Sequence, residues 1–255
     1  MDGIDGDGGM NTFGNKPGMV KNDEVRRALF DISRAHRILD LEGHNDMSLG
    51  HLSYRDPWGR GLWLKRGNIG LEEVFDEDFI LIDFDGEVLG GDGVRHLEWP
   101  IHTEIMRARS DVVAVGHTHA LHATLLGCTG EGLRPYTNEG VWFAEPPPRY
   151  LTTSDLIDTP ALGRDLAQCM GRADAIFLRN HGVCFVGRTI KEMCLAGIFL
   201  EKAARAQIML AQSGLKHSFP DAAEIEKKRR TIYPQRAVDN FWDYYNRKLD
   251  RKEAK

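Results

Sequence analysis

The chain has 255 residues, of which 42% are hydrophobic and 28% charged, and its formal net charge at pH 7 is −5. This length allows one good-sized hydrophobic core or two small ones. The slightly acidic balance gives no general attraction to nucleic acid or to an anionic membrane surface, so we expect neither as a partner.

Three features that the sequence lacks indicate where in the cell the protein is expected. The N-terminus lacks the basic and apolar layout of a signal peptide. No run of 18 apolar residues offers a membrane span. The four cysteines form no Cys-x-x-Cys pair and lie in apolar segments, so they are expected to be buried thiols in a reducing compartment. We therefore expect a cytoplasmic protein.

The first half of the chain is predicted to combine one helix with hairpins. Residues 1–20 are rich in glycine and polar residues and are predicted to form a flexible tail before a single folded domain over residues 21–255. From Asp23 to Leu39 apolar residues recur at helical spacing. After a polar loop, Asp85-Gly86 marks a hairpin turn. Strand patterns cover residues 51–55, 61–66, 78–84 and 87–89.

The second half alternates helical and strand patterns. Helices are predicted over residues 98–110 with Pro100 in the first turn, over 120–127, 159–172 and 189–212, and near 225–230 and 241–248. Strands are predicted over residues 111–119 and on both sides of a turn in 175–187, whereas 140–150 is expected to be irregular. Hairpins mixed with helices indicate an α/β domain around a mostly antiparallel central sheet.

Histidines are concentrated in the middle of the chain, where five of the ten lie between His96 and His122. His117 and His119 are two residues apart at the end of a predicted strand. A period of two sends both side chains to the same face, as joint metal coordination requires. Two surface histidines at a strand end would show the same spacing, so the pair alone supports both interpretations equally.

Two more residues favour the metal interpretation. His181 lies in the turn between two apolar strands, where Asn180 and Gly182 suit a tight backbone. Glu98 lies at a helix start, where a carboxylate also suits the helix dipole. Three imidazoles and one carboxylate are a suitable ligand set for zinc or manganese, with positions left open for substrate. The sequence separations are too long to establish a site by themselves.

The remaining histidines are assigned lesser roles. His122 is expected to be an outer partner or a capping residue, because a further imidazole ligand would close the coordination sphere and block catalysis. His102 lies four residues after Glu98 on one helix face, where it either orients Glu98 or packs in the core. Structural or surface roles are expected for His36, His44 and His217.

The order of these motifs resembles the class II aldolase/adducin family: Glu98, then His-x-His at 117–119, then Arg-Asn-His-Gly at 179–182. The likeness runs from about Asp23 to Gln212. It implies a three-layer α/β/α domain and a homotetramer with active sites near subunit interfaces. It also implies one divalent metal ion per subunit, Zn²⁺ or Mn²⁺, with Glu98 as both ligand and acid/base. The three imidazole ligands are then His117, His119 and His181.

Two segments depart from the family members that act on sugar phosphates. Those members hold the phosphate with a GNIS-like loop and a Ser-Ser pair before the glutamate. Here residues 50–53 read Gly-His-Leu-Ser, and residues 95–97 read Arg-His-Leu. Glu98 also argues against the pentose-phosphate epimerases, which carry aspartate at this position. Residues 133–150 are more similar to the branch that includes decarboxylases of hydroxylated aromatic or pyridine carboxylic acids.

These observations predict a metal-dependent decarboxylase of a hydroxylated aromatic or pyridine carboxylate, with Glu98 or His102 as proton donor. The alternatives are an aldolase acting on an unphosphorylated hydroxy-keto substrate and a non-catalytic, adducin-like interaction module. The adducin-like members have lost the metal ligands that this chain retains. Arg55 is a further candidate cation for the substrate carboxylate, although a surface ion pair explains it equally well. Substrate contacts are assigned to Arg95, His96, Ser53, Asn180 and Tyr150.

Overall fold

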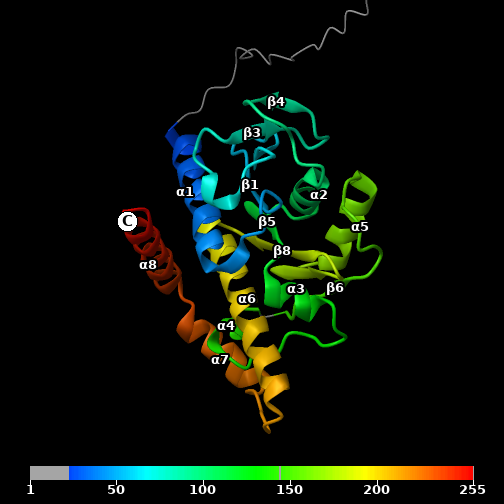
Figure 1. Cartoon of the computed structure of the whole chain (residues 1–255), viewed down its shortest axis with the longest axis vertical. Helices are drawn as coiled ribbons and strands as arrows, with labels where there is room; N and C mark the ends of the chain where they lie inside the picture. Colours follow the sequence, from blue (N-terminus) through cyan, green and yellow to red (C-terminus); the bar gives the residue numbers. More distant parts are fainter. Residues whose placement is uncertain (1–22, 144, 255) are drawn as a thin grey trace, which may run out of the picture.

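The computed structural model describes residues 23–143 and 145–254 (Figure 1), so the predicted tail over residues 1–20 lies outside the described residues. The strands are β1 (His51–Arg55), β2 (Leu62–Lys65), β3 (Phe79–Ile82), β4 (Val88–Gly90), β5 (Ala114–Thr118), β6 (Arg149–Tyr150), β7 (Ala175–Leu178) and β8 (Gly182–Gly187). The α-helices are α1 (Asp23–Leu39), α2 (Trp99–Ala108), α3 (Leu121–Gly127), α4 (Asn138–Val141), α5 (Pro160–Met170), α6 (Ile190–Ser213), α7 (Ala222–Ile232) and α8 (Gln235–Glu253).

The helix boundaries follow the capping signals in the sequence. The side chain of Thr189 accepts a hydrogen bond from the backbone N–H of Glu192 and starts α6, which ends at Gly214 in the left-handed conformation. Thr159 caps α5 in the same way, and Pro100 lies in the first turn of α2. The predicted long helix from Thr189 is therefore confirmed.

The central sheet has the strand order β4-β3-β2-β1-β5-β8-β7-β6. It is mixed, which corrects the prediction of a mostly antiparallel sheet. Strand β6 runs parallel to β7, whereas the other neighbouring strands in the described residues pair antiparallel. The reason is that α5 connects β6 to β7 as a crossover helix, which allows parallel pairing. The prediction of irregular structure over residues 140–150 missed β6.

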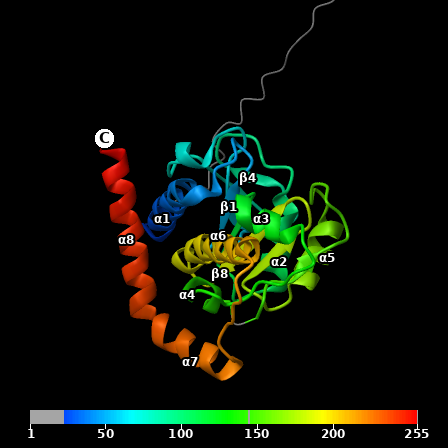
Figure 2. The same cartoon turned by 60° about the horizontal axis from the view of Figure 1, so that its bottom comes forward.

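Helices pack against both faces of the sheet, and alternation along β8 separates two hydrophobic clusters. Val183 and Phe185 face the cluster that includes α1, α3, α6 and α8. Cys184 and Val186 face the cluster built with α2 and α5. Figure 2 shows α1 and α6 on one side of the sheet and α2 and α5 on the other. The α/β fold class is confirmed, and β8 lies between the two clusters.

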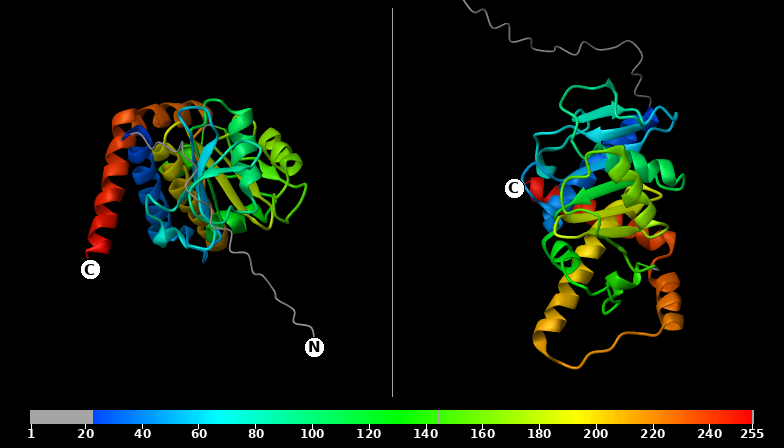
Figure 3. Two further views of the ribbon diagram at one scale, coloured as in Figure 1. Left: turned by 90° about the horizontal axis from the view of Figure 1, so that it is seen from above. Right: turned by 90° about the vertical axis from the view of Figure 1, so that its right-hand side faces the viewer.

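The C-terminal helix α8 lies along α1 and α6 (Figure 3). Arg37 of α1 pairs with Glu253 at 2.8 Å, and Arg34 pairs with Asp250 at 2.5 Å. Lys248 contacts Glu42, which lies in the π-helical turn Asp40–His44 after α1. Helix α8 therefore covers a face of the segment that leads from α1 into the first strand.

The structure bears on the predictions about the cysteines and about membrane-spanning segments. Cys184 and Cys194 are buried as expected, but Cys128 and Cys169 are exposed because each lies on the outward side of its helix end. The prediction of four buried thiols is wrong for these two residues. In the described residues no helix is long and apolar enough to cross a membrane.

Candidate metal centre

The four predicted metal ligands come together at one end of the sheet. His117 lies on β5 and His119 directly follows it, while His181 occupies the turn that leads into β8. Antiparallel pairing of β5 with β8 places Thr118 opposite Val183, so these three histidines meet. Glu98 is the N-cap residue of α2, whose start faces the same strand ends.

The distances within this cluster suit a single divalent ion. His117 Nε2 lies 3.4 Å from Glu98 Oε2, and His181 Nε2 lies 3.5 Å from Glu98 Oε1. One ring nitrogen each of His117, His119 and His181 lies within 4.8 Å of the others. Ligands bound at about 2.0–2.1 Å to a tetrahedral ion are separated by roughly 3.4 Å. The side chains present therefore fit the implied metal.

The hydrogen-bond pattern leaves inward-facing nitrogens available. Nε2 of His117 and Nε2 of His119 are buried and form no hydrogen bond within the described residues. Their outer nitrogens are engaged, His117 Nδ1 with Val183 O at 3.1 Å and His119 Nδ1 with Asp46 Oδ2 at 2.5 Å. Such a pattern is typical of metal-binding histidines, which use one nitrogen for the metal and the other for a fixed partner.

Glu98 is held as an anion. Burial alone would raise the pKa of this carboxyl, but the neighbouring His117 and His181 side chains hold that pKa well below its usual range. Glu98 Oε1 also accepts a hydrogen bond from the backbone N–H of Ile157 at 2.9 Å. The carboxylate therefore has the charge of a metal ligand or a base, and acts as an acid only after taking up a proton.

His51 is a member of the cluster that the sequence interpretation missed. This buried residue of β1 lies with Nε2 at 4.0 Å from Glu98 Oε2, and its backbone pairs directly with His117. Its Nδ1 lies 2.6 Å from Nε2 of His102, whose Nδ1 lies 2.7 Å from the Ser53 hydroxyl. The available signal was the strand pattern of residues 51–55, which puts His51 and Ser53 on the same face.

The comparison with known families fits this geometry. The model of the family described as "Class II Aldolase and Adducin N-terminal domain" matches residues 30–208. The chain belongs to this family. The resemblance based on Glu98, His117, His119 and His181 is thereby confirmed.

Relatives of this chain within the class II aldolase family carry names of different enzymes. A "3,4-dihydroxyphthalate decarboxylase" of Rhodococcus jostii is 27% identical over 207 residues, covering 76% of this chain and 85% of that protein. A "5-methylthioribulose-1-phosphate/5-deoxyribulose-1-phosphate aldolase" of Rhodospirillum rubrum is 30% identical over 180 residues, covering 71% and 78%. The solved structure of an L-fuculose 1-phosphate aldolase from Glaciozyma antarctica superimposes with a TM-score of 0.78, at 24% identity and 94% and 95% coverage. This last likeness establishes the class II aldolase fold.

A cavity of about 160 Å³ adjoins the cluster in this class II aldolase fold. Of the predicted substrate-binding residues, only His96 lines it, and burial is the main cause that lowers the pKa of His96 to about 4. His96 is therefore neutral near pH 7 and offers a hydrogen bond rather than a charge. The full lining is Leu49, His51, His96, Leu97, Glu98, His119 and Leu156.

The other predicted substrate contacts lie elsewhere or are already engaged. The Arg95 guanidinium donates to the carbonyl of Gly86 in the β3–β4 turn and lies over the Trp99 ring at 4.9 Å. Asn180 is exposed in the β7–β8 turn with a φ of 56°. Tyr150 is buried in the cluster beneath α2 and α5. Ser53 and His102 bond one another, and His102 reaches the cluster through His51.

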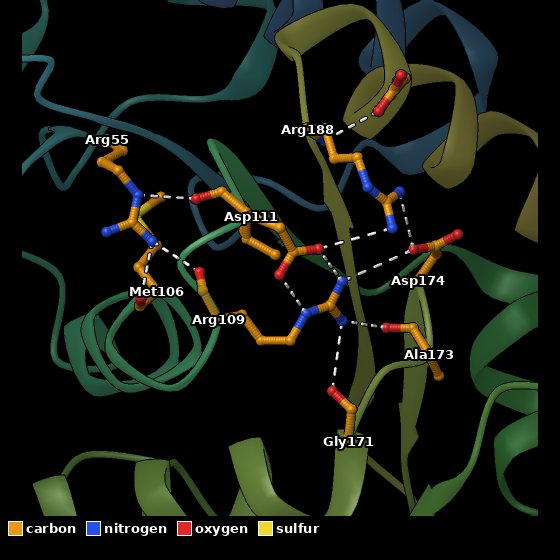
Figure 4. A network of polar contacts seen from close by, with 10 residues as sticks. Arg55, Met106, Arg109, Asp111, Gly171, Ala173, Asp174 and Arg188 are labelled. Atoms are coloured by element: carbon orange, nitrogen blue, oxygen red, sulfur yellow. Dashed lines mark hydrogen bonds and ion pairs between the residues drawn. The ribbon is translucent and has the colours of Figure 1, made fainter.

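Two residues considered for function have structural contacts instead. Figure 4 shows Arg55 directed at backbone carbonyls; it donates to those of Met106, Arg109 and Val112 at 2.6–2.8 Å. Arg55 therefore ties the end of α2 to β1, and no carboxylate substrate is needed to explain it. His122 Nδ1 lies 2.5 Å from Glu201 Oε1. This contact agrees with the expectation that His122 is not among the three imidazole ligands.

Proposed function

We propose that the protein is a divalent-metal-dependent decarboxylase of a hydroxylated aromatic or pyridine carboxylate. The observation that carries this proposal is the lining of the cavity beside the histidine cluster. Three leucines, Leu49, Leu97 and Leu156, provide an apolar wall that suits a flat ring. A phosphate group needs several hydrogen-bond donors, commonly backbone N–H groups and hydroxyls, and no hydroxyl side chain lines this cavity among the described residues.

The reaction leaves an electron pair on a ring carbon when CO₂ departs. A divalent ion held by Glu98, His117, His119 and His181 supplies positive charge beside the oxygen on which negative charge develops. Glu98, held as a carboxylate, accepts the proton of the substrate hydroxyl and returns it to the ring carbon, so that the proton count balances. His102 is linked to the same place by way of His51, whose Nδ1 lies 2.6 Å from His102 Nε2 and whose Nε2 lies 4.0 Å from Glu98 Oε2.

Substrate orientation is assigned to His96, which lines the cavity, and to Asn180 and Arg95, which do not line it. His96 provides a neutral hydrogen-bonding group, and Asn180 stands in the turn that carries His181. Arg95 is proposed to bind a carboxylate that the substrate retains, which requires its guanidinium to leave Gly86 and Trp99. Ser53 contributes by holding His102, and Tyr150 by packing behind α2.

An aldolase acting on an unphosphorylated hydroxy-keto substrate is the second candidate. Aldol cleavage also leaves a carbanion equivalent, so the same ligands serve both reactions. The Rhodospirillum rubrum relative named as an aldolase favours this alternative, whereas the apolar cavity favours the decarboxylase. The third interpretation is an adducin-like interaction module, which the retained set of metal ligands disfavours.

The assembly proposal is a homotetramer of catalytic domains spanning residues 21–255, each with one zinc or manganese ion. Leu121 and Leu125 lie one turn apart on α3 with 61% and 48% of their surface exposed. This helix begins two residues after the proposed ligand His119, and the pair supports a surface that another subunit covers.

The function is tested with protein stripped of metal and reloaded with zinc or manganese. Elemental analysis should give one ion per subunit, and hydroxy-aromatic or hydroxypyridine diacids should release CO₂. The matched control is His119→Ala, which should lose both metal and CO₂ release. Aldehyde release from a hydroxy-keto compound without CO₂ from any aromatic acid would replace the decarboxylase with the aldolase. A protein that binds metal but releases neither product would refute both.

A further inference from the structure

The ligand His119 is held from outside by a carboxylate on a separate loop. Asp46 Oδ2 lies 2.5 Å from His119 Nδ1, which is the ring nitrogen remote from the cluster. With Nδ1–H donated to this carboxylate, the lone pair lies on Nε2, the nitrogen that is buried without a partner. The contact therefore fixes both the ring orientation and the tautomer that a metal needs.

The loop that carries Asp46 is itself anchored. The backbone N–H of Leu49 donates to the carbonyl of Asp46 at 3.0 Å, which closes a tight turn. Lys65 is fully buried, and its ammonium group donates to the carbonyls of Ser48 at 3.2 Å and Ile69 at 2.5 Å. Met47 in this turn has a φ of 49°, in the left-handed region that is uncommon for a non-glycine residue, and its side chain is exposed. The backbone that carries the Asp46 carboxylate is therefore held by hydrogen bonds on its C-terminal side.

The three ligand histidines differ in the hydrogen-bond partner of the ring nitrogen that faces away from the cluster. His117 Nδ1 has the backbone carbonyl of Val183 as its partner, and His181 Nδ1 is buried without a hydrogen bond in the described residues. His119, at 18% side-chain exposure, is more accessible than the other two and has the only charged outer partner of the three within the described chain. A charge-assisted hydrogen bond is roughly twice as strong as a neutral one. The most accessible ligand thus receives the strongest support.

We propose that Asp46 is a positioning residue that holds His119 in its metal-binding orientation and tautomer. This inference rests on the proposed metal centre, but it does not depend on which reaction the centre performs. Asp46 lies outside the family motifs formed by residues 117–119 and 179–182, and its separation of 73 residues from His119 hides the pairing in the sequence.

The test is the zinc dissociation constant, measured by competition with a chromogenic chelator. Asp46→Ala should weaken zinc binding by roughly 10–100-fold. Asp46→Asn keeps an acceptor of the same shape without the charge, so its zinc affinity should lie between those of the wild type and Asp46→Ala. The matched control is Glu201→Ala, because Glu201 contacts His122 Nδ1 at the same 2.5 Å but supports no proposed ligand. This control should lose thermal stability and keep the zinc affinity of the wild type.

The zinc affinities of these variants decide whether Asp46 positions His119. Wild-type zinc affinity in Asp46→Ala would overturn the proposal, and so would an equal loss of affinity in Glu201→Ala. If Asp46→Ala does not fold, Asp46→Asn decides, with unchanged affinity counting against the proposal. A wild-type protein that binds no zinc or manganese would overturn the metal centre itself. That result differs from a failure of the decarboxylase proposal, in which metal binds normally and CO₂ is not released.

Discussion

Substitution of Gly182 by alanine should disturb the metal centre by steric contact alone. The added Cβ would lie 2.5 Å from His119 Cδ2, 2.7 Å from Thr118 O and 3.3 Å from His117 Cε1. Carbon atoms in contact are normally about 3.5–4.0 Å apart, so the His119 ring must retreat by roughly 1 Å. The backbone of Gly182 does not have a positive φ, which means that alanine adds crowding without conformational strain.

The displacement of the His119 ring sets the expected losses of stability, turnover and zinc affinity. Overpacking should lower the free energy of unfolding by about 1–3 kcal/mol. A ligand misplaced by about 1 Å should reduce turnover on the order of 100-fold and should weaken zinc binding as well. Urea unfolding and chelator competition measure the two effects separately.

The control for this substitution is Gly130→Ala, whose Cβ meets nothing within 4 Å and should change stability by less than about 0.5 kcal/mol. Wild-type zinc affinity and stability in Gly182→Ala would refute the reasoning, because the closest contacts include a backbone oxygen that cannot rotate away.

Three further predictions concern other parts of the molecule. Arg55→Ala should lower the free energy of unfolding by about 2–4 kcal/mol through its lost hydrogen bonds, with zinc affinity unchanged. Burial lowers the pKa of His44 from 6.5 to about 4, so the unfolded chain binds this proton more readily than the folded one. Stability should therefore fall as the pH drops below 6.5, by about 2 kcal/mol from His44 at pH 5, and urea unfolding of His44→Gln should show a smaller drop. Light scattering should give a mass of several chains, reduced in Leu121→Asp; a wild-type monomer would contradict the tetramer.

The parts of the site that could be predicted are those encoded locally. The two-residue spacing of His117 and His119 fixes their common face, and the Asn-His-Gly turn fixes the place of His181. His51 and Asp46 were missed because their contacts depend on strand pairing and on a loop that lies far away in sequence. The strand period places His51 on the same face as Ser53, but no periodicity within one segment reports which residue of another strand or loop a side chain meets.

The fold shows the same limit. The predicted helices and hairpins have strong local signals and are confirmed, whereas β6 is only two residues long and follows three prolines. Its parallel pairing depends on α5 crossing over the sheet, which the strand pattern does not reveal. Arg95 likewise precedes Glu98 in sequence, but the guanidinium extends to the β3–β4 turn, because a long side chain reaches beyond its neighbours.

The pairing of α1 with α8 has a consequence for synthesis of the chain on the ribosome. Arg34 and Arg37 emerge long before their partners, since Arg37 and Glu253 are separated by 216 residues. Until α8 has been made, the guanidinium groups of Arg34 and Arg37 lack these carboxylate partners. Contacts between such distant residues also form slowly during folding. Translation that stops short of α8 would leave Glu42, in the segment leading to Asp46, with Lys202 of α6 as a partner but without Lys248.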